Sequence, residues 1–193
     1  MRRTVAIALC ALALGGTACT TSVTSPAAVN GHRSIPDRSG AVDQAKQVNC
    51  PASSPGVDLH SPTAVAIAEV RATWTFDTTS DLGWYTGELA ACAYMTPSYA
   101  KSIRSHPPQG APGSTWMIWA AHRATTSVTA SAEADPGGPS DTALTAYRKI
   151  TATVTPHGTA GWVGQPEIWV TYLVASRTSP GAPWKIAATE TTP

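Results

Sequence analysis

The sequence predicts an α+β domain in which N-terminal helices pack on a curved, four-stranded antiparallel sheet. Apolar residues recur at helical spacing over residues 61–104, the only long segment with that periodicity. Four later runs rich in Thr, Val and Ile are separated by stretches of Gly and Pro, as strands joined by hairpins require. We expect the helices to cover one face of this sheet, because each element must bury its apolar side against another.

The bulk composition indicates a single domain with a leader and no attraction to polyanions. The chain has 193 residues and a net charge of +1. Removal of an N-terminal signal containing Arg2 and Arg3 leaves 11 basic against 12 acidic side chains. We therefore expect no nucleic-acid partner, because no field of one sign is present. The composition carries no signal for an oligomeric state.

Residues 1–18 have the three-part layout of a secretory signal peptide. Two arginines precede an uncharged run from Val5 to Leu14, which is too short to span a bilayer as a permanent helix. Small residues directly before Cys19 resemble the lipobox of bacterial lipoproteins, which implies that Cys19 carries a lipid. We expect the protein on the extracytoplasmic face of the cell membrane, anchored there by its N-terminal lipid. The alternative is ordinary signal cleavage near Ala18 and secretion.

Residues 19–59 are predicted to be a disordered tether, because they are rich in Ser, Thr and Pro and have no periodic apolar face. Cys10 leaves with the signal and Cys19 carries the lipid, so Cys50 and Cys92 remain. In an oxidising compartment we expect these two to form a disulfide bond. The alternative is two free buried thiols. A catalytic thiol is not expected, because neither cysteine has a neighbouring His or a motif around it.

The single domain is expected over residues 60–193, and its first helix has a clear start. Ser61 can accept a hydrogen bond at the cap position, and Pro62 follows where its missing N–H costs nothing. This helix should end near Asp77. One side of it carries the apolar residues Val65, Ala68, Ala72 and Phe76.

Two further helices are expected before the strands. Asp81 can cap a second helix over residues 82–93, whose inward side chains would be Trp84, Leu89 and Cys92. Thr96 can cap a short third helix that begins at Pro97.

The remaining chain predicts four strands, over residues 115–133, 141–155, 166–176 and 184–190. The second strand alternates apolar and polar residues, which is typical of a sheet with one dry and one wet face. The third strand is apolar on both faces, so we expect it to be central and more deeply buried than the others. Three short connections favour an antiparallel meander.

Local phrases of the chain resemble the nuclear transport factor 2-like, cystatin-like cone fold over about residues 61–190. The phrases are AVAIAEVRATWTFDTT, DLGWYTGELAACAYMTPSYAKSI and the final strand APWKIAATE. More narrowly, the chain is similar to exported actinobacterial members related to conjugative-transfer scaffold proteins, with Trp84, Thr96, Pro97 and Trp184 at matching places. The resemblance implies an accessory role in conjugation or secretion and an envelope protein as partner. Those scaffolds usually carry a transmembrane helix, whereas this chain has a lipobox-like signal.

Some members of the cone fold are enzymes of the isomerase or dehydratase type, with an acid or base at the open end. Candidate side chains for such chemistry in this chain are Asp77, Tyr94, Tyr99, His122 and Tyr172. The sequence pairs no two of them, and His122 is expected on a strand. The five histidines lack ligand spacing, and no nucleophile elbow or phosphate-binding Gly loop is present. We therefore expect no metal and no cofactor.

Seven tryptophans are a high count for this length, and six are expected to fill the cone: Trp74, Trp84, Trp116, Trp119, Trp169 and Trp184. Trp162 lies in a loop and is a candidate partner or ligand contact, as are His122 and Tyr94. The leading hypothesis is a surface-anchored, non-enzymatic binding or assembly module. The alternatives are a cone that binds a small apolar ligand, and an isomerase or dehydratase. A side-chain-filled cone would exclude both alternatives, whereas a cavity reached by Asp77, His122 or a tyrosine would support them.

Overall fold

The computed structural model describes residues 50–193, and these form an α+β domain. The helices are α2 (Pro62–Trp74), α3 (Trp84–Ala90), α4 (Pro97–Ser105) and α5 (Ser114–Ala121), with short 3-10 helices at Ala91–Tyr94 and Thr159–Gly161. The strands are β1 (Thr125–Glu133), β2 (Thr145–His157), β3 (Glu167–Ser176) and β4 (Lys185–Thr192). The predicted signal peptide, Cys19 and most of the predicted tether lie outside the described residues. Over residues 50–193 no helix combines the length and apolarity that a membrane crossing needs.

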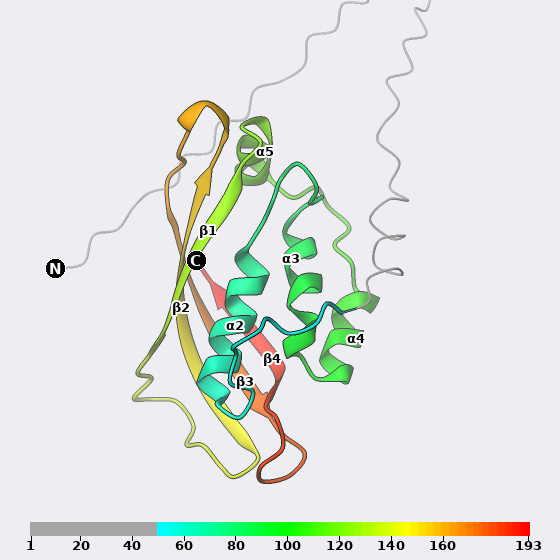
Figure 1. Ribbon diagram of the computed structural model, residues 1–193, viewed down its shortest axis with the longest axis vertical. Helices are drawn as coiled ribbons and strands as arrows, with labels where there is room; N and C mark the ends of the chain where they lie inside the picture. Colours follow the sequence, from blue (N-terminus) through cyan, green and yellow to red (C-terminus); the bar gives the residue numbers. More distant parts are fainter. Residues whose placement is uncertain (1–49) are drawn as a thin grey trace, which may run out of the picture. The chain divides into compact units, whose positions relative to one another are not determined.

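The predicted α+β class and the antiparallel meander are both confirmed. The four strands form one sheet in the order β1-β2-β3-β4, and each neighbouring pair is antiparallel. Helices α2, α3 and α4 lie on one side of this sheet, and α5 stands at the end where β1 begins (Figure 1). The arrangement is cone-like, with the helical layer facing the inner side of the strands.

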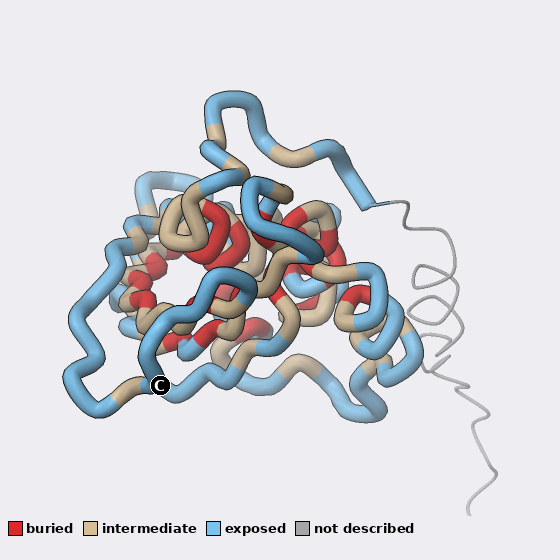
Figure 2. The backbone as a smooth tube through the Cα atoms, turned by 90° about the horizontal axis from the view of Figure 1, so that it is seen from below, coloured by how far each residue is buried: buried red, intermediate tan, exposed pale blue. Residues whose placement is uncertain are grey.

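The main core lies where α2 meets the inner face of the sheet. Val65 and Val70 of α2 pack with Ile150, Leu173 and Ile186 from β2, β3 and β4, and all of these side chains are fully or almost fully buried. Buried segments gather in the middle of the molecule and exposed loops surround them (Figure 2). Burial of such aliphatic side chains is the principal stabilising contribution to the fold.

The two predicted Pro-led helix starts are confirmed. The side-chain oxygen of Ser61 accepts a hydrogen bond from the N–H of Ala64 at 3.2 Å, which caps α2. Thr96 caps α4 in the same way, by accepting from the N–H of Tyr99 at 3.3 Å. Capping side chains therefore determine where α2 and α4 begin.

Helix α2 ends earlier than expected and buries a different side. It stops at Trp74, and the N–H of Phe76 instead donates to the Thr126 hydroxyl of β1 at 2.8 Å. Its buried side chains are Val65, Ala66, Glu69 and Val70, whereas Ala68 and Ala72 are only half-buried. The helix is apolar around most of its circumference, so the sequence alone does not select the covered side.

The second helix also differs from its prediction. α3 begins at Trp84, after Gly83, and changes to a 3-10 helix at Ala91. Asp81 does not cap it, because its Oδ2 accepts a hydrogen bond from the N–H of Asp77 at 2.7 Å. Asp81 therefore closes the turn that precedes α3.

The prediction of one strand over 115–133 is wrong in its first part. Residues 114–121 form α5, and only 125–133 form a strand. Trp116 and Trp119 stand three residues apart, so a helix places both on one side, where each is 3% exposed. His122 consequently follows the last turn of a helix and does not lie on a strand.

Strand β3 is central, as predicted, but it is not the deeply buried strand that was expected, because its outer face is exposed. It pairs with β2 on one side and β4 on the other. Ile168 is 61% exposed and Tyr172 is 41% exposed. Both side chains lie on the outer face of the sheet, because the described helices pack on the inner face.

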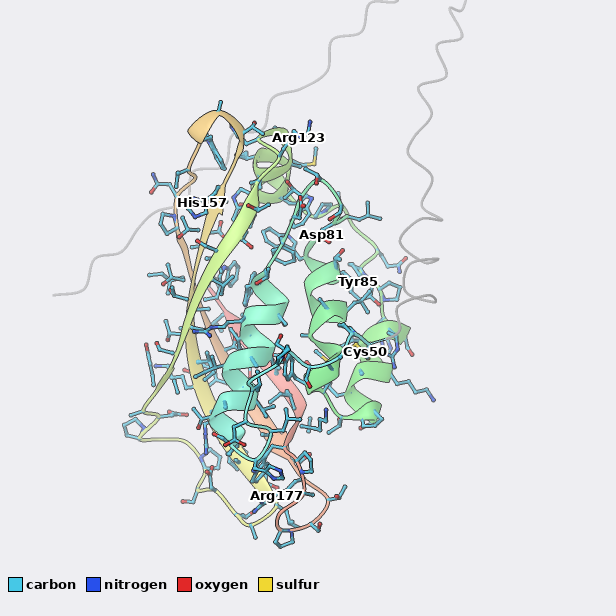
Figure 3. All side chains as sticks on the ribbon, in the orientation of Figure 1. Cys50, Asp81, Tyr85, Arg123, His157 and Arg177 are labelled. Carbon is cyan, nitrogen blue, oxygen red and sulfur yellow. A yellow bond between two sulfur atoms is a disulfide. The ribbon has the colours of Figure 1, made fainter. Side chains whose placement is uncertain are left out.

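The first described residues, which the sequence assigns to the tether, lie against the domain. Cys50 and Cys92 are joined by a disulfide bond, with Cα atoms 5.4 Å apart. Figure 3 shows Cys50 beside the helices α3 and α4. The N–H of Ser54 donates to the Tyr94 hydroxyl at 2.8 Å. Residues of the segment 50–59 therefore make covalent and hydrogen-bonded contacts with the domain.

Candidate functional site

A cavity of about 380 Å³ lies between the helical layer and the inner face of strands β3 and β4. This volume is within the range of small-molecule binding sites. Aromatic side chains form much of its wall, namely Trp74, Phe76, Trp84, Tyr99 and Trp169. The polar lining residues are Glu69, Glu88 and four threonines, Thr73, Thr171, Thr189 and Thr191.

The periodicities of helix and strand explain why these side chains converge. Trp169 and Thr171 are two residues apart on β3, and Thr189 and Thr191 are two apart on β4, so each pair shares the inner face. On α2, Glu69 is followed four residues later by Thr73, which places both on one side of the helix. The lining is therefore a direct consequence of the meander and of the way α2 lies on it.

The aromatic wall is a set of rings in mutual contact. Trp74 of α2 stacks on Trp169 of β3, with ring centroids 4.5 Å apart and planes inclined by 18°. Trp84 of α3 meets Trp74 edge to face at 6.1 Å and meets Phe76 at 5.4 Å. Such pairs stabilise one another beyond simple burial, so the contacts link α2, α3 and β3 around the cavity.

Glu69 is the most unusual residue of the cavity, because it is a carboxylic acid that is only 3% exposed. In the described part of the chain its carboxyl group has one hydrogen-bond partner, the Thr73 hydroxyl, which donates to Oε1 at 3.4 Å. Burial raises the pKa of Glu69 to about 8, the Thr73 hydrogen bond opposes this rise, and the nearby carboxyl of Glu88 adds to it. The group is therefore mostly protonated at pH 7.

Two further titratable groups line the cavity. The Tyr99 hydroxyl lies 2.6 Å from the hydroxyl of Thr189, and burial raises the pKa of Tyr99. Glu88 is an exposed residue, and partial desolvation of its carboxyl group raises its pKa. The cavity is therefore lined by the buried acid Glu69, by the solvent-accessible acid Glu88 and by Tyr99, whose hydroxyl is hydrogen-bonded to Thr189.

Tyr99 is the one residue of the five chemical candidates that lines the cavity. Asp77 lies in the turn after α2, where two hydrogen bonds from Thr79 to its carboxylate lower the pKa of Asp77. Tyr172 projects from the outer face of β3, and Tyr94 is buried with its hydroxyl bound to the backbone of Ser54. These residues therefore do not form a common catalytic site.

His122 and Trp162 contact each other, although the sequence selects them separately. Their rings stack with centroids 4.1 Å apart and planes inclined by 4°. The stack joins the end of α5 to the connection between β2 and β3, at the end of the molecule where Arg123 and His157 are labelled in Figure 3. Tyr94 packs in the main core, so the three predicted contact residues do not form one site.

The sequence interpretation missed Glu69 and Glu88, the acidic residues of the cavity. A signal for Glu69 is present in the sequence, because an isolated acid follows Val65 and Ala66 at helical spacing on an otherwise apolar helix. Glu88 carries no comparable signal, since an exposed acid on a helix is ordinary. Across residues 50–193 no group of three His, Cys, Asp or Glu side chains converges as metal ligands.

Fold and cavity together define the class of protein: a cone-like α+β module with an internal pocket. No protein-family model matches the chain, and no curated protein matches it. Among solved structures, an IcmL-like type IV secretion system protein from Legionella pneumophila is similar with a TM-score of 0.44, at 14% identity over 68% of this chain and 89% of that chain. TraE protein in complex with 2-(2-furyl)isonicotinic acid has a TM-score of 0.41, at 20% identity over 67% of this chain and 92% of that chain.

Proposed function

We propose that this protein is a non-enzymatic binding module of the cell envelope that holds a small molecule in its cone cavity. The observation that carries the proposal is the cavity of about 380 Å³ with aromatic walls and a buried acid. Apolar walls of this kind supply binding free energy, and a few polar groups orient the ligand. Of the functions weighed from the sequence, a small-ligand cone agrees best with this geometry.

Tyr99 lines the cavity, which by the criterion drawn from the sequence also supports an isomerase or dehydratase; we propose binding because the Tyr99 hydroxyl is already hydrogen-bonded to Thr189. General acid–base catalysis uses a titratable group whose partner is free to exchange a proton with the substrate. Among the described residues, the cavity is lined by carboxyl groups and by Tyr99, whose hydroxyl is engaged by Thr189. Over residues 50–193, the lining includes no imidazole, thiol or amine that could act beside the acids as a second catalytic group.

We place the module outside the cytoplasmic membrane, held by a lipid on Cys19. The signal-like first 18 residues and the small residues before Cys19 support export and lipidation. The disulfide between Cys50 and Cys92 fits an oxidising compartment. Intact mass spectrometry of the membrane fraction should show a mature chain that begins at Cys19 with an acyl increment. A mature chain without that increment contradicts the anchor.

Adjacent positions on β4 offer a matched pair of variants to test the cavity. Thr191 lines the cavity, whereas Thr192 pairs with Val170 on the outer face of the sheet. Thr191→Phe should fill the pocket, and Thr192→Phe adds the same volume on the opposite face. The probe is N-phenyl-1-naphthylamine, a neutral fluorophore whose emission rises in apolar sites.

We expect saturable probe binding to the wild type and to Thr192→Phe, and an affinity at least about tenfold lower for Thr191→Phe. Thermal unfolding of both variants controls for loss of the fold. The proposal fails if the wild type binds no probe, or if both variants bind it as tightly as the wild type.

A second function, docking to an envelope protein, is favoured by the exposed side of α5. Met117 is 61% exposed and Ile118 is 55% exposed, while the same helix buries Trp116 and Trp119 on its other side. α5 contains no charged residue, and a helix that is apolar all round is usually covered on all sides. The resemblance to conjugative-transfer scaffold proteins makes a component of a conjugation or secretion machinery the expected partner.

In-cell photo-crosslinking tests this second function. A benzoylphenylalanine in place of Met117 should crosslink to one envelope protein, which mass spectrometry identifies. The same group in place of the exposed Glu190 on β4 is the control and should give no such adduct. Equal adducts at both positions, or none at either, contradict docking through α5.

A further inference from the structure

We infer that the ligand of the cavity is a small organic cation, a protonated amine attached to an apolar body. This inference depends on the proposed function, because it names the class of molecule that the same cavity binds. Three features of the lining lead to it: its carboxylic acids, its aromatic rings and the incomplete hydrogen bonding of Glu69.

The ionisable side chains of the lining include two carboxylic acids and no base. Glu69 and Glu88 contribute carboxyl groups, and no Lys, Arg or His is among the described residues that line the cavity. An anionic ligand would meet these carboxyl groups without any positive partner, which costs several kcal/mol inside a protein. A cation would meet carboxyl groups whose ionised form is complementary in charge to it.

The aromatic rings add a second attraction for a positive charge. Trp74, Trp84 and Trp169 all line the cavity, and indole is the ring system that attracts cations most strongly. A neutral apolar ligand would gain only from burial against these rings. An ammonium group gains from burial of its apolar body and from the ring electrons together.

Glu69 provides the specific position for the positive group. It is a carboxyl group buried to more than nine-tenths, and in the described structure its hydrogen bonding is limited to the Thr73 hydroxyl at 3.4 Å. A buried polar group with unused hydrogen-bonding capacity is costly unless a ligand completes it. An ammonium N–H can donate to this carboxyl on α2, and its remaining N–H groups can donate to the hydroxyls of Thr171 or Thr189, which line the cavity from the sheet.

Binding of such a ligand is coupled to the release of one proton. The titratable groups that face Glu69 are Glu88 from α3 and Tyr99 from α4, while β3 and β4 present only threonine hydroxyls and Trp169. Burial raises the pKa of Glu69 to about 8, so the free protein holds a proton there at neutral pH. When the ammonium binds, the carboxyl gives this proton to solvent and the ligand keeps its own charge. Affinity for a cation should therefore rise with pH until about pH 8, by up to roughly tenfold per pH unit.

Three ligands of nearly equal shape test the inference by isothermal titration calorimetry: phenylbutylamine, phenylbutanol and phenylbutyrate. At pH 8 we expect the amine to bind at least about tenfold more tightly than the alcohol, and the carboxylate to bind most weakly. Titrations of the amine at pH 7 in two buffers of different ionisation enthalpy should show net release of protons. Binding of the uncharged alcohol should not tighten as the pH rises from 6 to 8.

Two isosteric variants, a test and a control, show whether the preference for the amine over the alcohol comes from Glu69. Glu69→Gln should reduce the ratio of amine to alcohol affinity towards one and abolish the proton release, while alcohol binding persists. Glu190→Gln, on the exposed outer face of β4, should leave both quantities unchanged. Since the three ligands already discriminate on the wild type, the test does not depend on the folding of Glu69→Gln.

An amine that binds no more tightly than the alcohol, or that does not bind at all, overturns the inference. Binding of the neutral naphthylamine probe then decides separately whether the proposed function survives. If that probe also fails to bind, both the ligand class and the binding function are wrong.

Discussion

Replacement of Glu69 by Gln should stabilise the protein at neutral pH and remove a pH dependence of its stability. The carboxyl is buried beneath α2, and its pKa in the folded state is about 8 against an ordinary value of 4.5. A folded-state pKa above the unfolded value means that the folded state binds the proton more tightly. This contribution to stability is complete below pH 4.5 and is lost as the pH rises through about 8.

The size of the effect follows from the two pKa values. Between pH 4.5 and pH 7 the unfolded chain releases the proton while the folded protein mostly retains it. At about 1.4 kcal/mol per pH unit, the wild type should lose about 3 kcal/mol of unfolding free energy over this interval from Glu69 alone. Gln has nearly the same shape and no proton to lose, so the variant lacks this loss.

Urea unfolding at several pH values between 4.5 and 8, followed by tryptophan fluorescence with the disulfide intact, measures this difference. The unfolding free energy of Glu69→Gln minus that of the wild type should grow steadily with pH. Glu190→Gln serves as the control, because that residue is exposed on the outer face and should give a flat difference. A difference for Glu69→Gln that stays constant within about 0.5 kcal/mol would refute the account of Glu69 as a buried neutral acid.

Three further predictions concern the frame around the cavity. Substitution of Cys50 and Cys92 by Ser should lower the unfolding free energy by about 4 kcal/mol in urea titrations, because the bond closes a loop with a sequence separation of 42; a loss below about 1 kcal/mol contradicts this. Gly87→Ala should cost about 1–3 kcal/mol or more in the same assay, since an added Cβ would overlap a carbonyl oxygen of α2, whereas Gly110→Ala, with open space around it, should be near neutral. Tyr94→Phe should lower the unfolding free energy by about 1 kcal/mol and speed amide exchange at Ser54, because the N–H of Ser54 donates to the Tyr94 hydroxyl. Unchanged exchange at Ser54 would contradict that contact.

The parts of the fold that depend on local chemistry could be predicted from the sequence. Ser61 and Thr96 each stand one residue before a proline, and each accepts a backbone N–H at the start of its helix. The alternation along β2 selects Ile150 and Val154 for the inner face, and both are buried. Such signals need only a few neighbouring residues, so tertiary packing does not override them.

The parts that depend on long-range packing could not be predicted. The segment that forms α5, STWMIWAA, is apolar at almost every position, so it shows neither a helical nor a strand period clearly. The spacing of Trp116 and Trp119 was the available signal for a helix. The apolar outer residues of β3 predicted a deeply buried strand, although Ile168 lies exposed on the outer face of the sheet.

The candidate site escaped sequence reasoning for the same reason. Histidines and tyrosines are candidate catalytic residues in the sequence because they titrate. In the structure, however, Tyr172 lies on the outer face of the sheet and Tyr94 lies in the main core. The burial of Glu69 depends on the packing of α2 against β3 and β4, which follow about a hundred residues later in the chain, so the local sequence does not reveal it. The chemical character of an ordinary glutamate is therefore set by partners that no local pattern reveals.

The disulfide between Cys50 and Cys92 also has a mechanical consequence. Tension applied from the N-terminal side reaches the described domain at Cys50, and the covalent bond passes it directly to Cys92 in the helical layer. Reduction of the bond would reroute the pull through Leu59 and α2, the helix that carries the buried acid.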